Sequence, residues 1–170
     1  MDESKILYSE YDGVHFLRFQ GTILHNLAPT LDQFLQMLEQ RGGPARFVLD
    51  LTDTRNIDST MLGLLARIAK RANAAGEGPP TLVCPNDEII DLLMGIGFDE
   101  VFQLVSGSRP PLGDAQALSP APTDKRALAQ TMWDAHQELI LLKEGNRLLF
   151  KDVMELLRTV LDEPRPESPS

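Results

Sequence analysis

The feature that most constrains the fold is an alternation, over residues 46–105, between short apolar runs and longer stretches with helical spacing. The runs 46–51 and 81–84 are mostly apolar and too short for helices, which is typical of strands buried on both faces. The stretches that follow them place apolar side chains on one helical face: Met61, Leu64, Leu65, Ile68 and Ala72, then Ile89, Ile90, Leu93 and Ile96. With a last short strand at 101–105, this order predicts an open α/β sheet with right-handed crossovers and helices packed on it.

The N-terminal residues add a hairpin and a first helix. Residues 6–20 alternate between apolar and polar side chains on either side of Asp12-Gly13, a dipeptide that favours a tight turn between two strands. From about residue 27 to residue 40 the apolar spacing becomes helical, and Gly42-Gly43-Pro44 ends this helix. We therefore assign residues 1–105 to one α/β domain.

The composition changes at residue 106. Residues 106–123 are rich in proline, glycine and serine, which favours a linker, and the similar residues 164–170 favour a disordered tail. Residues 124–163 contain no helix breaker except Gly145. Their apolar residues recur at alternating steps of four and three, with one polar exception: Leu128, Met132, Ala135, Leu139, Leu142, Asn146, Leu149, Val153, Leu156 and Val160. This heptad pattern predicts a long C-terminal helix of coiled-coil type.

The polar exception, Asn146, falls at an a position of the heptad. One buried asparagine at such a position fixes the register of a two-stranded parallel coil. The pattern therefore favours a homodimer through residues 128–160 with Asn146 as its register-setting residue. Phe150 and Leu157 widen the apolar stripe beyond a two-stranded interface. Two alternatives stay open: a long helix that folds back over the α/β domain, and a helical hairpin broken at Gly145.

Composition and charge argue against several classes of function. The formal net charge is −9, and basic residues gather only in a short patch at Arg67, Lys70 and Arg71, so we expect no binding to nucleic acid. No apolar run approaches the roughly 20 residues of a membrane span, and the first residues do not follow the pattern of a secretory signal. The single cysteine, Cys84, allows no internal disulfide, so we expect a cytoplasmic protein.

Residues with catalytic or metal-binding chemistry are scattered. His15, His25 and His136 lack the short spacings of a zinc site, and the sequence has no phosphate-binding glycine loop. Asp50 follows a strand, but Thr52 stands where a magnesium-binding pair of aspartates would need its second carboxylate. We therefore expect no metal, no cofactor and no enzymatic activity.

The segment Ile57-Asp58-Ser59-Thr60-Met61-Leu62-Gly63 leads from a polar loop into the second helix of the domain. Aspartate, serine and threonine are preferred N-cap residues, because their side-chain oxygens accept hydrogen bonds from the free N–H groups of the first turn. Taken alone, this segment therefore indicates helix capping.

In its context the segment indicates more. The order Val-Leu-Asp-Leu, loop, Ile-Asp-Ser-Thr-x-Leu-Gly, after a β-hairpin and a helix, resembles the STAS domain of bacterial anti-sigma-factor antagonists. The resemblance covers about residues 5–105, with Gly21 and Gly97-Phe98 as weaker support. Met61 stands where the family usually has glycine, and Leu24 stands where it often has an acidic residue. The resemblance implies a STAS-like fold for residues 1–105.

The resemblance also implies a regulatory role. It makes Ser59 the phosphoacceptor for a partner that is both an anti-sigma factor and a serine kinase, with Asp58, Ser59, Thr60 and Met61 in contact with that partner. Phosphate on Ser59 would release the partner by repulsion and desolvation, and a serine phosphatase would reset the switch. One alternative is a constitutive scaffold that self-assembles through its C-terminal helix. Another is a small-ligand sensor that uses the cleft beside the second helix.

Overall fold

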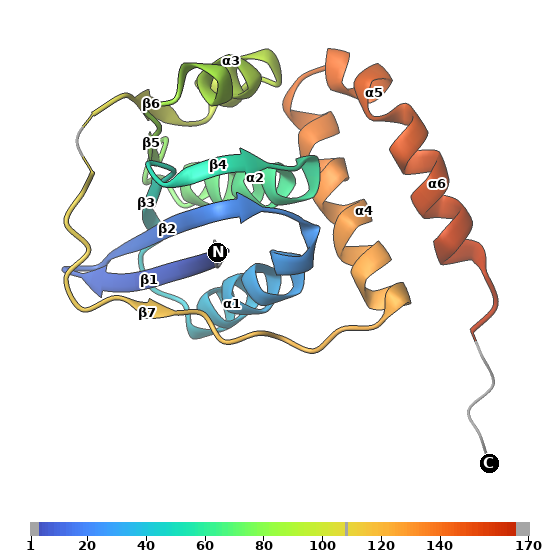
Figure 1. The fold of residues 1–170 in the computed structure, drawn as a ribbon, viewed down its shortest axis with the longest axis horizontal. Helices are drawn as coiled ribbons and strands as arrows, with labels where there is room; N and C mark the ends of the chain where they lie inside the picture. The colour runs from blue at the N-terminus through green and yellow to red at the C-terminus, as the bar shows by residue number, and fades with distance from the viewer. Residues whose placement is uncertain (1–3, 108, 166–170) are drawn as a thin grey trace.

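The computed structural model describes residues 4–107 and 109–165, which form a layered α/β domain with a helical hairpin standing at one end of it (Figure 1). The sheet has the strand order β6-β5-β3-β2-β1-β7, and β4 pairs with β2 off this path. Its strands are β1 (Lys5–Tyr11), β2 (Val14–Ile23), β3 (Arg46–Asp50), β4 (Thr54–Ile57), β5 (Thr81–Val83), β6 (Gln103–Val105) and β7 (Gln116–Ala117). Of the predicted tail, residues 166–170 lie outside the described residues.

The predicted β1–β2 hairpin is confirmed. Asp12 and Gly13 both have positive φ, which a two-residue turn between twisted strands requires. The second strand extends beyond the alternating residues 6–20 and continues to Ile23. Strand β2 pairs with β3 from Val14 to Arg18 and with β4 from Gly21 to Ile23, where the register shifts between Gly21 and Thr22. Strand β4 was not predicted, because the polar loop after β3 contains no apolar run.

Three helices of the domain match the predicted amphipathic stretches: α1 (Ala28–Arg41), α2 (Ser59–Ala74) and α3 (Asp87–Gly95). Helices α1 and α2 pack side by side, and their apolar faces join the buried side chains of β2, β3 and β5 in one core. Asn86 caps α3, because its side chain accepts hydrogen bonds from the backbone N–H groups of Glu88 and Ile89. Short 3-10 turns, His25–Leu27 and Phe98–Glu100, precede α1 and follow α3.

The predicted linker is held against the domain in its described residues. Arg18 connects it to the sheet, since Nε donates to the buried Asp50 carboxylate (2.6 Å) and Nη2 donates to the Pro110 carbonyl (2.7 Å). Strand β7 then pairs with β1, and the Ala121 N–H donates to the Thr30 hydroxyl (3.2 Å). The segment therefore follows the sheet edge and passes α1 on its way to the hairpin (Figure 1).

The C-terminal residues form a helical hairpin, one of the two alternatives, in place of one continuous helix. Helix α4 (Lys125–Leu142) ends shortly before Gly145, and α5 (Gly145–Leu149) and α6 (Lys151–Asp162) reverse the direction of the chain (Figure 1). Helix α6 packs on α4, where the Arg158 guanidinium lies 5.8 Å from the centre of the Trp133 ring. Helix α4 packs on α2 and α1, so the hairpin is folded back over the α/β domain.

Asn146 lies at the turn of this hairpin and is buried. Its side-chain amide donates to the carbonyls of Leu139 (2.7 Å) and Ile96 (3.0 Å). Both N–H groups are therefore used within the chain, where they join the end of α4 to the loop after α3. The register-setting role in a parallel dimer stays a prediction, as does the dimer through residues 128–160.

We expect Asn146→Leu to lower the free energy of unfolding of the full chain by about 1–3 kcal/mol, because two carbonyls lose their donor while the side-chain volume is nearly kept. Denaturant titration measures this change. Leu148→Asn is the matched control, since Leu148 is 80% exposed, and it should alter stability by less than about 0.5 kcal/mol. Equal stability of Asn146→Leu and the wild type would contradict the hydrogen-bonding role.

Candidate functional site

The segment predicted as the site forms the first turn of α2, at the end of the sheet where β2 and β4 stop. Asp58 is the N-cap residue, because its Oδ1 accepts a hydrogen bond from the Met61 N–H (3.0 Å). Its Oδ2 accepts from the His25 N–H (2.6 Å) and lies 3.2 Å from the His25 ring Nδ1. Asp58 therefore fixes the start of α2 to the connection between β2 and α1.

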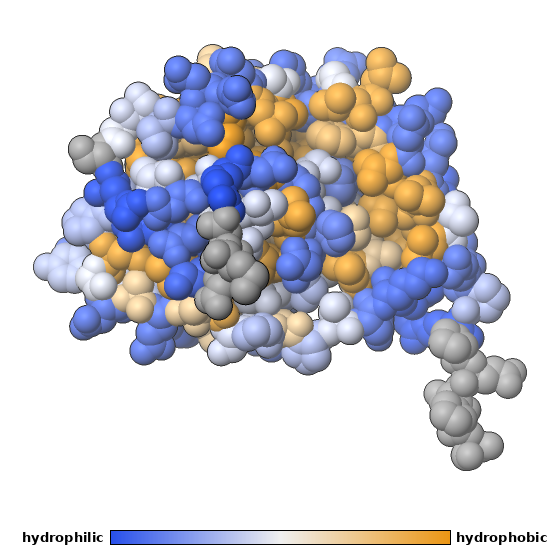
Figure 2. All heavy atoms as spheres, viewed as in Figure 1, coloured by the Kyte–Doolittle hydropathy of each residue, from blue (hydrophilic) through white to orange (hydrophobic). Residues whose placement is uncertain are grey.

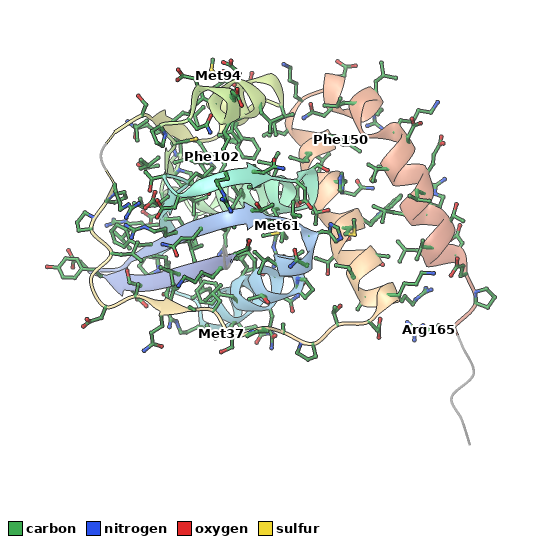
Figure 3. The ribbon with its side chains drawn as sticks, in the orientation of Figure 1. Met37, Met61, Met94, Phe102, Phe150 and Arg165 are labelled. Atoms are coloured by element: carbon green, nitrogen blue, oxygen red, sulfur yellow. The ribbon has the colours of Figure 1, made fainter. Side chains whose placement is uncertain are left out.

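The four residues of the predicted site differ in exposure. Asp58 and Ser59 are partly exposed, whereas Thr60 and Met61 are buried. Figure 3 places Met61 between the sheet and the hairpin, inside the molecule. Contact with a partner stays a prediction for all four residues. In the folded chain, however, only the side chains of Asp58 and Ser59 reach the surface.

The Ser59 hydroxyl has a partner that the sequence analysis did not find. Its Oγ lies 2.8 Å from Nε2 of His136, a buried residue of α4. The other ring nitrogen, Nδ1, lies 2.7 Å from the Met132 carbonyl, which can only accept. Nδ1 therefore carries the proton, and the Ser59 hydroxyl donates to Nε2. Seventy-seven residues separate the two side chains, and no local pattern signals the contact.

The surroundings of His136 favour the neutral form of its ring and hold the ring in place. Burial lowers the pKa of the His136 imidazole below its usual value, and the Met132 carbonyl and the Asp58 carboxylate oppose this effect without reversing it. The Phe150 ring packs edge-on against the imidazole, with ring centres 5.5 Å apart. Figure 3 shows Phe150 at the top of the hairpin, beside α4. The imidazole is thus held between Ser59 and Phe150.

Helix α4 reaches Ser59 because α2 has a glycine at its contact point. A Cβ atom at Gly63 would lie 2.1 Å from the Ala135 carbonyl oxygen and 2.7 Å from the Ala135 Cβ. Only glycine therefore allows the two helices to approach this closely. Gly63 is part of the sequence motif around Ser59, but only the position of α4 explains why a glycine is needed there.

A serine that donates to a histidine is also half of a nucleophile–base arrangement. Here a backbone carbonyl, and not a carboxylate, orients the far side of the His136 ring. A crevice of about 340 Å³ between α1, α2 and α4 borders Gly63 and Ala135, but neither Ser59 nor His136 lines it. The geometry therefore describes a covered hydroxyl rather than a substrate site.

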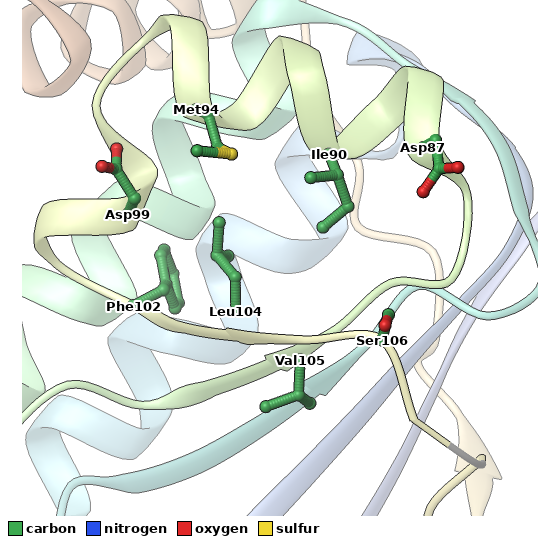
Figure 4. Close-up of a pocket in the computed structure, with 8 residues that line it drawn as sticks. All are labelled: Asp87, Ile90, Met94, Asp99, Phe102, Leu104, Val105 and Ser106. Atoms are coloured by element: carbon green, nitrogen blue, oxygen red, sulfur yellow. The ribbon is translucent and has the colours of Figure 1, made fainter.

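A second pocket, of about 430 Å³, lies between α3 and the segment that includes β6 (Figure 4). Its walls are mainly apolar, from Ile90, Met94, Phe102 and Leu104, and the carboxylates of Asp87 and Asp99 lie at opposite ends of α3 (Figure 4). This pocket lies beside the third helix, whereas the small-ligand alternative places its cleft beside the second helix.

The other residues with catalytic or metal-binding side chains lie away from this site. Among residues 4–107 and 109–165, no three histidine, cysteine, aspartate or glutamate side chains are grouped as metal ligands would be. Cys84 is buried, and burial raises the pKa of its thiol. Asp50 accepts hydrogen bonds from Arg18 and Thr52 in a buried structural cluster. Within the described part of the chain, no helix is both long and apolar enough to cross a membrane.

Comparisons with known proteins agree with this fold. The family model of the STAS domain matches residues 5–109, so α4, α5 and α6 lie outside the match. The crystal structure of TM1081 from Thermotoga maritima, a proposed anti-sigma factor antagonist, is 24% identical with a TM-score of 0.50, over 57% of this chain and 82% of that chain. The anti-sigma factor antagonist SpoIIAA in its unphosphorylated form is 13% identical with a TM-score of 0.50, over 64% of this chain and 90% of its own.

No curated protein sequence matches the chain. At these identities the two solved structures show a shared fold. The family model, however, covers well over half of the sequence, including every residue of the segment around Ser59. On that match, the chain belongs to the STAS domain family.

Proposed function

We propose that this chain is an anti-sigma-factor antagonist that works as a partner switch. With a free Ser59 hydroxyl it binds an anti-sigma factor that is also a serine kinase, and with phosphate on Ser59 it releases that partner. The observation that carries the proposal is the position of Ser59: a partly exposed serine on the first turn of α2, directly after the capping Asp58, in a STAS domain.

The chemistry assigns the catalysis to other proteins. The kinase transfers the γ-phosphoryl group of ATP to Ser59 Oγ, so that a P–O bond forms, ADP leaves and the hydroxyl proton is released. The phosphatase hydrolyses this bond with water and returns the hydroxyl and inorganic phosphate. This chain supplies the acceptor, and we propose no enzymatic activity for it.

The fold tolerates phosphate at this position, whereas a bound partner does not. Phosphorylation adds a charge of about −1.5 to −2, and the N–H groups and dipole of a helix N-terminus favour an anion. The α/β domain should therefore stay folded. At an interface the same charge lies beside the Asp58 carboxylate and must be desolvated, and both effects weaken binding.

A second candidate, a scaffold that self-assembles through the C-terminal helices, has one observation in its favour. Large apolar side chains of the hairpin are exposed: Leu141, Leu148, Leu149 and Leu156. Figure 2 shows apolar side chains gathered on the part of the surface that the hairpin forms. If the chain is such a scaffold, sedimentation shows a dimer for the wild type and loss of this dimer for the double variant Leu148→Lys/Leu156→Lys. The partner switch requires neither result.

For the switch, we expect the cognate kinase, taken as the anti-sigma-factor kinase encoded nearest to this chain, to place one phosphate on Ser59 in the presence of ATP. Ser59→Ala should accept none and should bind the kinase equally well with and without ATP, because no charge can form at the interface. Mass spectrometry and a pull-down measure the two effects. Ser106→Ala is the matched control, since Ser106 is exposed at a distance from α2, and it should behave as the wild type.

Two results would contradict the proposal. One is a wild-type chain that carries no phosphate at Ser59 after incubation with the kinase and ATP. The other is a wild-type chain that keeps its partner after Ser59 has been fully phosphorylated.

A further inference from the structure

The helical hairpin occupies the surface on which the proposed switch depends. Helix α4 lies across the start of α2, with Ala135 against Gly63 and His136 against Ser59. Farther along α2, Lys70 forms an ion pair with Glu138 of α4 (3.3 Å). A partner that approaches the first turns of α2 therefore meets α4.

The hairpin is an addition to the family domain. The STAS match ends at residue 109, and α4 begins at Lys125. The segment between them passes along the sheet edge and is fixed at several points, so the hairpin stays attached to the domain when its contacts with α2 are lost. The hairpin also has internal contacts of its own, between Trp133 and Arg158 and between Arg126 and the Glu163 carbonyl. The hairpin can therefore move as one unit.

We infer that the hairpin of α4, α5 and α6 is an autoinhibitory cover, which occupies the α2 docking surface from within the same chain and is fastened over the Ser59 hydroxyl by His136. This inference rests on the proposed function. It adds a closed state in which the chain neither binds its partner nor accepts phosphate, and the partner or kinase competes with the cover for α2.

The closed state blocks phosphoryl transfer for two reasons. The Ser59 hydroxyl is already engaged as a donor to His136 at 2.8 Å. A kinase must also bring the γ-phosphorus of ATP in line with Ser59 Oγ, and His136 of α4 already lies against that oxygen. Transfer therefore requires that α4 first leaves α2.

Phosphate on Ser59 is equally incompatible with the closed state. Phosphorylation removes the proton that Ser59 Oγ donates to His136 Nε2, and the 2.8 Å between these two atoms cannot hold a phosphorus atom. Once Ser59 is phosphorylated, the cover must stay displaced, even though the phosphoprotein has lost its partner. The cover therefore acts on the unphosphorylated chain, where it sets the fraction that is competent to bind.

The sharpest test releases the cover from the α4 side and leaves the sequence of α2 unchanged. Ala135→Glu places a carboxylate at a buried contact with the Gly63 backbone, which the closed state cannot accommodate. Ala127→Glu is the matched control, because it makes the same substitution on the exposed first turn of the same helix. Both variants are full-length chains.

Hydrogen exchange with mass spectrometry measures the opening without any partner. In Ala135→Glu we expect at least tenfold faster exchange in α4 and in the first turn of α2, with β2 and β3 as protected as in the wild type. Ala127→Glu should match the wild type throughout. Unchanged protection of α4 in Ala135→Glu would overturn the inference. So would loss of protection throughout the sheet, since the α/β domain would then not stay folded when the hairpin leaves α2.

A second variant reaches the same contact from α2. Gly63→Ala introduces a Cβ that would overlap the Ala135 carbonyl, while a Cβ at Gly95, near the end of α3, would meet no atom within 4 Å. Gly63→Ala should open α4 as Ala135→Glu does, and Gly95→Ala should leave it closed. Equal protection of α4 in the two glycine variants would overturn the inference.

A phosphorylation assay with the kinase then tests the cover and the proposed switch independently. When only the open fraction is competent, the initial rate of Ser59 phosphorylation is reduced by that fraction, so Ala135→Glu should be phosphorylated at least about tenfold faster than the wild type and Ala127→Glu. Equal rates in all three chains would overturn the cover and leave the proposed function intact. If none of the three accepts phosphate at Ser59, the proposed function fails, and the inference fails with it.

Discussion

The close contact between α2 and α4 at Gly63 is the constraint on which the rest of this structure depends. Because Gly63 has no Cβ, the Ala135 carbonyl of α4 can lie directly against the α2 backbone. This approach brings His136, the next residue of α4, within hydrogen-bonding distance of Ser59. One residue without a side chain thus allows a segment from the other end of the chain to contact the Ser59 hydroxyl.

Much of the α/β domain could be predicted from the sequence, because its signals are local. Asp12-Gly13 specifies a turn whose residues adopt positive φ, and Asn86 specifies a helix start by its side-chain oxygen. Strand β4 could not be predicted in the same way. It pairs with the end of β2, from Gly21 to Ile23, beyond the residues of β2 that pair with β3, and this depends on pairing across the sheet.

The C-terminal heptads show the limit of such signals. Apolar spacing predicts which side of a helix is buried, but not what buries it. Ala135 and Leu139 are buried as the pattern requires, but they pack in the core shared with the α/β domain, whereas Leu149 and Leu156 of the same series are more than 60% exposed. The turn between α4 and α5 breaks the series, and the Asn146 amide donates to carbonyls of its own chain.

The residues of the candidate site also differ in whether local sequence signals predict them. The Asp58 cap and the position of Ser59 follow from short-range chemistry, and both were expected. His136 was set aside as an isolated histidine, because nothing near it in the sequence points to Ser59, and its importance comes wholly from the way the hairpin folds back. If Ser59 is the proposed switch, the hairpin gives this STAS domain a way to limit access to it.

The most direct measurement of this account is a nuclear Overhauser experiment on a dilute sample that mixes isotope-labelled and unlabelled full-length chains in equal amounts. We predict contacts between the Gly63 Hα protons and the Ala135 methyl group that arise only within single chains. If these contacts are found between labelled and unlabelled chains, or if they are absent while α4 remains helical, the hairpin does not cover its own domain and the account is contradicted.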